Sequence, residues 1–275
     1  MDTKYEERGY LTENFRLFHL KDRPKQDIDW HYHDFHKIIV FLAGHGCYAI
    51  EGEKYRLRPG DMIFVSRGCV HRPEITDKED YERIILYISP EYLKSVGGRC
   101  NLETCFDRTR EQFRFVARPG EKYGHILKLL TELEALSEDT GFGHEILAQA
   151  VFLRFLITVT RAAESSGLTY VPAADTDPKI LSILQYLQDH LTETTSADAL
   201  SQRFNISKYH MMRRFKASTG CTIHGYLVSK RLLLAREMML VGSSATTACY
   251  DCGFSDYSAF SRAYKKLFGI SPKGK

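Results

Sequence analysis

The stretch LSQRFNISKYHMMRRFKASTG, residues 200–220, recurs in altered form as ACYDCGFSDYSAFSRAYKKLFG, residues 248–269. The matched pairs are Ser201 with Cys249 and Asn205 with Gly253 at a separation of 48 residues, then Arg213 with Arg262, Phe215 with Tyr264, Lys216 with Lys265 and Gly220 with Gly269 at 49. Such self-similarity indicates one supersecondary unit that is used twice. The one-residue difference in spacing falls within the turn of the unit.

Each copy has the order of a helix-turn-helix. A small residue, Ser201 or Cys249, precedes by four positions a residue that tolerates a positive φ, Asn205 or Gly253. The small side chain allows two helices to cross closely, and the tolerant residue makes the turn between them. A side chain that can cap the second helix follows each turn: Ser207 in the first copy, and Ser255 or Asp256 in the second.

Between the copies lies IHGYLVSKRLLLAREMM, residues 223–239, whose apolar periodicity predicts one continuous helix. A rigid helix would hold the two readers in a fixed relation. Each reader could then enter one of two successive major grooves, about 34 Å apart on one face of the duplex.

These residues carry a resemblance to the AraC/XylS family of transcription regulators. It rests on LSQRFNISKYHMMRRFK, on GFSDYSAFSRAYKKLFGISP, and on a TG…Y…R…A pattern at Thr219, Gly220, Tyr226, Arg231 and Ala235. The resemblance covers residues 178–275, which it implies form a DNA-binding domain. It assigns the base-facing positions to Tyr209, Met212 and Arg213 in the first reader and to Tyr257, Ser258, Ser261 and Arg262 in the second. It assigns phosphate contacts to Ser207, Lys208, Lys216, Lys265 and Lys266.

The charge distribution supports a polyanionic partner at one end of the chain. The net charge is only +3, but residues 178–275 contain 14 Lys and Arg against 6 Asp and Glu. The remaining residues are acidic overall, with 24 basic against 29 acidic side chains. Phosphate neutralisation by Lys and Arg drives nucleic-acid affinity, so we expect double-stranded DNA to bind the C-terminal part.

Composition indicates a soluble globular protein rather than a disordered or fibrous one. An apolar content of 43% with 27% charged residues is typical of a globular protein, and we expect neither export nor a membrane span. Seven cysteines, an odd number in a chain of this size, favour a reducing cytoplasm. Cys249 and Cys252 have the spacing of half a zinc site, but with no second pair following we interpret them as core thiols.

The first half of the chain alternates short β-rich runs with turn residues from about residue 15 to 88, which predicts a small antiparallel sandwich or barrel. His31, His33 and His71, with Gly44, Gly46 and Pro59-Gly60-Asp61, resemble the cupin barrel that many AraC-type regulators carry. The predicted fold class is therefore α+β. A cupin-like barrel over residues 1–120 and a helical hairpin over 121–166 precede a linker over 167–177 and an all-α domain of two helix-turn-helix units.

The barrel is expected to bind an effector rather than a metal. A metal cupin would add a glutamate to its histidines, and Lys37 stands at that position, where its cation repels a metal ion. We therefore expect no metal and no cofactor. His31, His33, Tyr48 and His71 are expected to contact a small polar metabolite such as a sugar. The alternative is that the histidines only hydrogen-bond strand ends.

The hairpin is expected to make a homodimer. Its apolar stripes are Ile126, Leu130, Leu133 and Leu136 on the first helix and Ile146, Ala150, Leu153 and Ile157 on the second. They would pack on a partner subunit, or alternatively on the barrel of the same chain.

The function expected from these features is effector-controlled transcription regulation without enzymatic activity, with RNA polymerase as a candidate further partner. The competing hypothesis is a metal-dependent cupin enzyme, an oxygenase or isomerase, with accessory helices.

Overall fold

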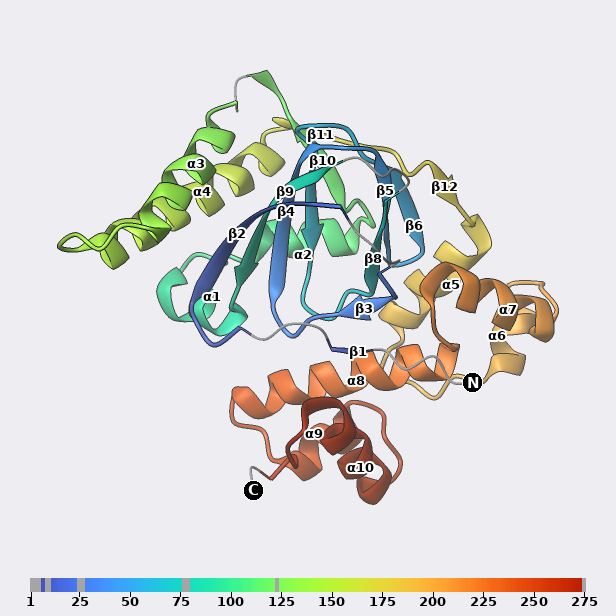
Figure 1. Ribbon diagram of the computed structural model, residues 1–275. Helices are drawn as coiled ribbons and strands as arrows, with labels where there is room; N and C mark the ends of the chain where they lie inside the picture. Colours follow the sequence, from blue (N-terminus) through green and yellow to red (C-terminus); the bar gives the residue numbers. More distant parts are fainter. Residues whose placement is uncertain (1–5, 8–10, 24–27, 76–79, 122–123, 274–275) are drawn as a thin grey trace.

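The computed structural model describes residues 6–7, 11–23, 28–75, 80–121 and 124–273. Within these ranges the first half of the chain forms two six-stranded sheets that face each other (Figure 1). The first has the strand order β1-β3-β8-β5-β6-β12 and the second β11-β10-β7-β4-β9-β2. The strands are β1 (Glu6–Glu7), β2 (Phe15–Asp22), β3 (His31–Tyr32), β4 (His36–Ala43), β5 (Gly46–Ile50), β6 (Glu53–Arg56), β7 (Met62–Val65), β8 (His71–Ile75), β9 (Tyr81–Ile88), β10 (Val116–Pro119), β11 (Leu168–Tyr170) and β12 (Asp175–Thr176).

Strand β4 shows why this half has two hydrophobic cores. Its run of apolar residues leaves no polar face, which is typical of a strand that is covered on both sides. Ile39 and Phe41 point into the space between the sheets. Ile38 and Val40 point the other way and pack under helices. The second sheet is therefore a wall between an inner core and an outer helical layer.

Four helices form the outer layer: α1 (Pro90–Gly97), α2 (Thr104–Glu111), α3 (His125–Ser137) and α4 (His144–Glu164). The predicted hairpin is α3 and α4, which pack side by side against the second sheet (Figure 1). Among the described helices, α4 alone has the length and apolar composition that could span a membrane. Its Phe152, Phe155 and Leu156 are fully buried in the outer core.

The stripes predicted on the hairpin have different surroundings. Three residues of the α3 stripe, Ile126, Leu130 and Leu133, are buried against the chain's own sheet. The α4 stripe lies on the opposite side from Phe152, so Ile146 is 73% and Ile157 39% exposed. The α3 stripe therefore packs on its own chain, which was the alternative given above. The exposed residues of the α4 stripe remain available for a partner subunit.

The segment 167–177 is more than a connector. Strand β11 pairs antiparallel with β10, and β12 pairs antiparallel with β6, so each extends one sheet. The Thr176 hydroxyl donates to the Glu53 carboxylate at 3.1 Å. Polar composition predicted a linker, but the backbone groups of this segment find partners at two open sheet edges, which fixes its path.

The C-terminal part is all helical, as the repeat predicted. It contains α5 (Pro178–Asp189), α6 (Ala197–Arg203), α7 (Lys208–Thr219), α8 (Ile223–Leu240), α9 (Ala245–Asp251) and α10 (Tyr257–Phe268). The stretch 223–239 forms one helix, α8, as expected. Buried residues of α5 to α8 continue the inner core of the sheets, whereas α9 and α10 make a separate small core with the second half of α8. The first reader is thus docked on the two facing sheets, which are called the barrel below.

Candidate DNA-binding interface and effector pocket

The first reader consists of α6 and α7. Asn205 makes the turn between them with a φ of +45°, the left-handed conformation that its sequence position predicted. The Ser207 hydroxyl caps α7 by accepting a hydrogen bond from the backbone N–H of His210 at 3.4 Å. Gly220, with a φ of +76°, ends the helix. A short polar residue, a cap and a glycine therefore set the limits of α7.

The second reader, α9 and α10, repeats this geometry. Gly253 makes its turn with a φ of +85° and Gly269 ends α10 with a φ of +73°. The cap is Asp256, whose carboxylate accepts a hydrogen bond from the backbone N–H of Ala259 at 2.6 Å. This decides between the two capping residues that the sequence left open. A carboxylate also complements the positive end of the helix dipole.

Arg231 of α8 ties the loop that leads into the first reader to the turn of the second reader. Its guanidinium donates to the backbone carbonyls of Leu191 and Glu193 in the loop after α5, and of Gly253 in the second turn, at 2.7–2.9 Å. A Cβ at position 253 would lie 2.3 Å from the Thr192 carbonyl oxygen. Only glycine allows this approach of the two readers, and the relation between them is fixed by main-chain contacts.

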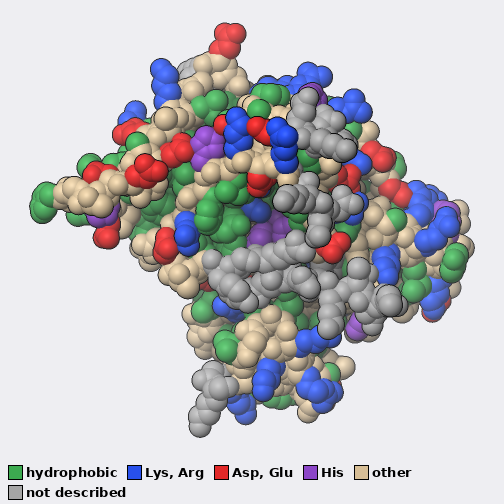
Figure 2. Space-filling model, viewed as in Figure 1, with side chains coloured by type: hydrophobic (Ala, Val, Ile, Leu, Met, Phe, Trp, Pro, Cys, Tyr) green, Lys and Arg blue, Asp and Glu red, His purple; other side chains and the backbone are tan. Residues whose placement is uncertain are grey.

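Most of the nominated DNA contacts are on the surface. The exposed residues are Tyr209, Met212, Arg213, Ser258 and Arg262 among the base-facing set, and Ser207, Lys208, Lys216, Lys265 and Lys266 among the phosphate set. Tyr209 is 77% and Met212 45% exposed, which is unusual for such large apolar side chains. Figure 2 shows Lys and Arg side chains over both readers, beside α6 and α7 and below α8. These surfaces can meet a duplex.

Two nominated residues differ from the rest. Tyr257 is half-buried, its ring packs against Phe260 at 5.7 Å between centroids, and its hydroxyl is buried. Its ring therefore packs partly on the small core of the second reader, and its role as a base contact stays a prediction. Ser261 is also half-buried. Cys249 and Cys252 are fully buried, as expected of core thiols.

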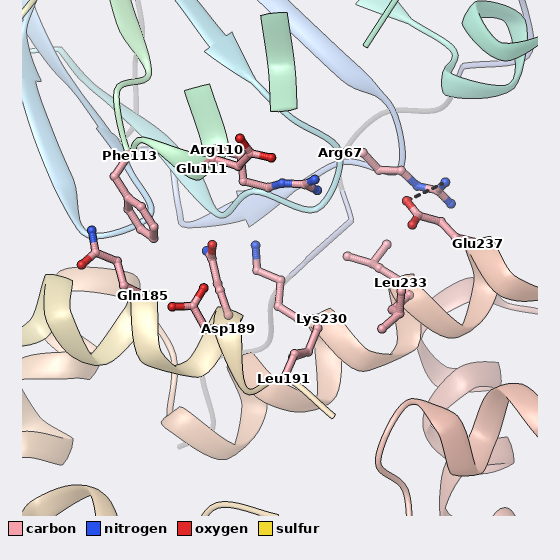
Figure 3. A pocket seen from close by; sticks show the side chains of 12 residues that line it. Arg67, Arg110, Glu111, Phe113, Gln185, Asp189, Leu191, Lys230, Leu233 and Glu237 are labelled. Atoms are coloured by element: carbon pink, nitrogen blue, oxygen red, sulfur yellow. Dashed lines mark ion pairs between the residues drawn. The ribbon is translucent and has the colours of Figure 1, made fainter. Parts of the chain in front are cut away.

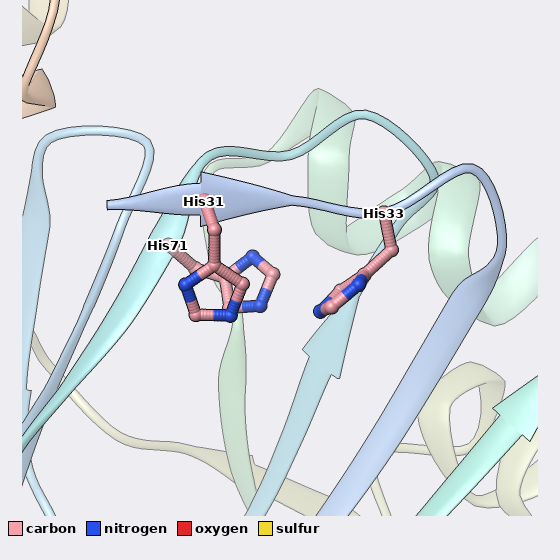
Figure 4. A group of neighbouring side chains, drawn as sticks. All are labelled: His31, His33 and His71. Carbon is pink, nitrogen blue, oxygen red and sulfur yellow. The ribbon is translucent and has the colours of Figure 1, made fainter. Parts of the chain in front are cut away.

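The four residues predicted to bind an effector lie together between the two sheets. His31 and His33 come from β3 and the residues that follow it, and His71 from β8, paired with His31 in the register (Figure 4). Their ring nitrogens lie within 4.8 Å of one another. The Tyr48 ring stacks on His71 at 5.8 Å between centroids. The sequence prediction of a shared pocket is consistent with this geometry.

Lys37 dominates the electrostatics of this pocket. Its ammonium lies 3.3 Å from Nε2 of His33 and 5.5 Å from the ring centre of Tyr87, and the residue is buried. Burial, together with the charge of Arg83, lowers the pKa of Lys37 to about 7. Burial and the nearby basic groups also hold the pKa of His71 well below its ordinary value, so this imidazole is neutral.

A feature that the sequence did not predict joins the barrel to α8. The Glu51 carboxylate is fully buried and accepts hydrogen bonds from the Lys230 ammonium and the Tyr226 hydroxyl, each at 2.7 Å, and from the Val70 N–H at 2.8 Å. Burial alone would lower the pKa of Lys230, but the charge and hydrogen bond of Glu51 raise it above its ordinary value. Glu51, Tyr226 and Lys230 are called the clasp below.

The clasp is built on a strained turn. Glu51 has a φ of +47° in the tight turn between β5 and β6, a conformation that glutamate rarely adopts. Such strain persists where surrounding contacts compensate it, and it marks candidate functional positions. Lys230 also lines a cleft of about 480 Å³ between barrel, α5 and α8, in which Figure 3 shows its side chain pointing toward the barrel.

Arg67 and Trp30 make further contacts between the two halves. Arg67 bonds Asp34 at 2.6 Å, and Asp34 in turn pairs with Arg236 of α8. The Trp30 ring lies against Gly220, where a Cβ would meet it at 2.3 Å. The Trp30 ring therefore covers the end of α7. Gly220 and Tyr226, both part of the family pattern, were the sequence signals for this interface.

Comparisons with known proteins identify both parts of the chain. The family described as AraC-like ligand binding domain matches residues 17–156, and a helix-turn-helix domain family matches residues 200–274. The chain is 27% identical to the HTH-type transcriptional activator RhaS of Escherichia fergusonii, over 91% of this chain and 88% of the relative. It is 29% identical to RhaS of Salmonella arizonae over the same shares. A solved structure of ToxT from Vibrio cholerae has 13% identity, covers 98% of this chain and 97% of its own, and gives a TM-score of 0.43.

The two RhaS relatives are named as transcriptional activators, so the hypothesis of a cupin enzyme is not favoured. The ligand-binding family covers slightly more than half of the chain, and the helix-turn-helix family covers both readers. From this coverage, the chain belongs to the AraC family of transcription regulators, with an N-terminal effector-binding domain and a C-terminal DNA-binding domain.

Proposed function

We propose that the chain is a cytoplasmic, homodimeric transcription activator that a small polar metabolite such as a sugar controls through the barrel. The observation that carries the proposal is the pair of capped readers, which Arg231 holds in a fixed relation. Arg213 and Arg262 are exposed on α7 and α10 and can offer bidentate donors to guanine in two grooves. The exposed lysines of the same helices would neutralise phosphates. RNA polymerase is a candidate partner of the bound activator.

Control would act through the clasp. Glu51 directly follows β5, which contributes Tyr48 to the pocket, and it holds the N–H of Val70, which precedes His71. An effector that contacts Tyr48 and His71 would therefore shift the residues on which Lys230 and Tyr226 are anchored. The effector changes the orientation of the DNA module only if it binds two arrangements of barrel and DNA module with different affinity.

Binding of the full chain to a duplex from the region upstream of adjacent genes, across a salt series, tests the DNA-binding role. We expect sequence-preferring binding that weakens linearly in a plot of log affinity against log salt. Lys216→Ala should weaken binding uniformly across sequences and reduce the slope by about 1, because one phosphate contact is lost. Lys128→Ala, on the exposed surface of α3, is the matched control and should leave the slope unchanged. Binding that is insensitive to both salt and sequence would contradict the role.

Dimerisation would use the exposed stripe of α4. Ile146 and Leu147 are 73% and 53% exposed, and Phe142 just before α4 is fully exposed, so large apolar side chains gather at this end of the helix as they do at interaction surfaces. A charge in a buried interface is unfavourable, so we expect Ile146→Glu with Ile157→Glu to convert a dimer into a monomer in sedimentation. Val96→Glu, at an exposed apolar position of α1, is the control. A double variant that still sediments as a dimer would show that the subunits meet through another surface, and a monomeric wild type would contradict the proposed homodimer.

A further inference from the structure

The pocket between the sheets combines positive charge with an absence of acidic lining. Its volume is about 230 Å³. The lining residues are Leu20, Ile28, His31, His33, Lys37, Ile39, Tyr48, Pro73, Tyr81, Arg83, Ile85 and Tyr87. Two of them are cations and three are tyrosines, and no carboxylate is found among these described lining residues. A neutral ligand would leave that positive potential uncompensated.

Lys37 is the cation without a counter-ion. Its residue is 6% exposed, and among the described residues no ion pair with a carboxylate is found for it. Arg83, by contrast, makes a bidentate pair with Asp22 at 2.6 and 3.0 Å. A buried ammonium without a counter-ion is costly, and burial accordingly lowers the pKa of Lys37 to about 7. A ligand carboxylate would supply the missing charge.

Two further polar atoms in this region have no partner in the described structure. The Tyr48 hydroxyl and Nε2 of His71 are buried and make no hydrogen bond. Tyr48 lines the pocket, and the His71 ring packs against the lining, 4.4 Å from the His31 ring and 5.8 Å from the Tyr48 ring between centroids. Nδ1 of His71 lies 2.9 Å from the Cys69 carbonyl. Since a carbonyl only accepts, Nδ1 carries the proton in the neutral ring, and Nε2 presents a lone pair that can accept a hydrogen bond from a hydroxyl group and would repel an anionic oxygen.

We propose that the effector is a small hydroxy carboxylic acid of the sugar-acid class, with its carboxylate on Lys37 and its hydroxyl groups at Tyr48, beside Nε2 of His71. Lys37 offers a cation to the acid group, and Tyr48 with Nε2 of His71 offers a donor and an acceptor to hydroxyl groups. The inference rests on the proposed effector role of the barrel and narrows its ligand from polar metabolites in general to anionic ones.

The pH dependence of affinity follows from the groups that face Lys37. These are His33 before β4, Arg83 and Tyr87 on β9, and His71 on β8. An anion binds the protonated ammonium, so binding above pH 7 must take up a proton. Affinity for the acid should therefore fall as pH rises through about 7, approaching tenfold per pH unit. A neutral sugar that accepts a hydrogen bond from Lys37 and donates hydrogen bonds to the imidazoles would not lose affinity in this way as pH rises.

Calorimetry of the full chain with matched pairs, glucuronate against glucose, galacturonate against galactose and gluconate against sorbitol, tests the inference. At least one acid should bind at least about tenfold tighter than its neutral partner, with proton uptake above pH 7. Lys37→Met should abolish the preference for the acid. Tyr48→Phe should weaken binding of the acid and leave the fold of the free protein unchanged. Lys94→Met, exposed on α1, is the matched control and should have no effect.

The failures of the two proposals are distinguishable. Neutral sugars that bind as tightly as the acids, with no effect of Lys37→Met, would overturn the anionic class and keep the effector role. Binding that requires added Zn²⁺ would also overturn it, because a metal on the imidazoles would then hold the ligand. Absence of binding by every acid at millimolar concentration overturns the inference, and absence of binding by all six compounds counts against both proposals.

Discussion

Replacing Glu51 by alanine is expected to destabilise the docked arrangement of barrel and DNA module by about 3–5 kcal/mol, the usual cost of removing one partner of a buried ion pair. The carboxylate is fully buried, and its loss leaves the Lys230 ammonium inside the protein without its counter-ion. Trp30, the only tryptophan, lies against Gly220 of the first reader. Its fluorescence during a urea titration therefore reports separation of the two halves.

A double-mutant cycle separates the clasp from a general packing defect. In Glu51→Ala with Lys230→Met no charge is left unpaired, so we expect the double variant to be more stable than Glu51→Ala alone. Glu91→Ala removes a carboxylate that is 52% exposed and lies 3.6 Å from Arg67. This control should change the free energy of unfolding by less than about 0.5 kcal/mol. Effects of Glu51→Ala and Lys230→Met that simply add would show that the two residues do not act as a pair.

Arg213→Ala and Arg262→Ala are each expected to weaken binding to the preferred duplex by about 1–3 kcal/mol, or about 5- to 150-fold. Each arginine is exposed on the second helix of its reader, where a guanidinium can donate two hydrogen bonds to one guanine. Each loss should relax sequence preference in one groove only. Titration of duplexes that vary one half of the site at a time, with selection from a randomised pool, measures both effects.

Arg99→Ala provides the control for the loss of one positive charge, because Arg99 is exposed after α1 in the N-terminal half. It should leave affinity and sequence preference unchanged. The losses from Arg213→Ala and Arg262→Ala should add in the double variant, since the two readers contact separate grooves. A single variant that lowers affinity equally for every sequence would assign its arginine to a phosphate rather than to a base.

The readers were predictable because their signals are local. A turn needs a residue that accepts a positive φ, and Asn205 and Gly253 are such residues at the positions where the structure has +45° and +85°. Caps act over three residues, so Ser207 could be identified directly. The choice of Asp256 over Ser255 could not, because it depends on the backbone angle at the start of α10. Tyr257 was nominated as a base contact from its family position, and only the tertiary structure shows that its ring packs on Phe260.

The grouping of the candidate effector residues was predictable from the sequence, and the charge of the pocket beside them was less so. His31, His33, Tyr48 and His71 were nominated from the cupin resemblance, and the structure brings them together. Lys37 was interpreted only as the residue that replaces a metal-binding glutamate. Its burial without a carboxylate partner in the described structure gives it a role of its own, which depends on what the strands on either side place beside it.

The sequence by itself determined the two helix-turn-helix units, the long helix between them and the β-rich first half, because each depends on periodicity, turn residues and caps within a few positions. Tertiary structure decided which face of α4 is exposed, the path of residues 167–177 and the clasp. Glu51 and Lys230 are 179 positions apart, and neither has a local pattern that names the other. Both are ordinary charged residues in sequence. Their pairing arises because docking of α8 removes both from water, and only an opposite charge at 2.7 Å makes that burial tolerable.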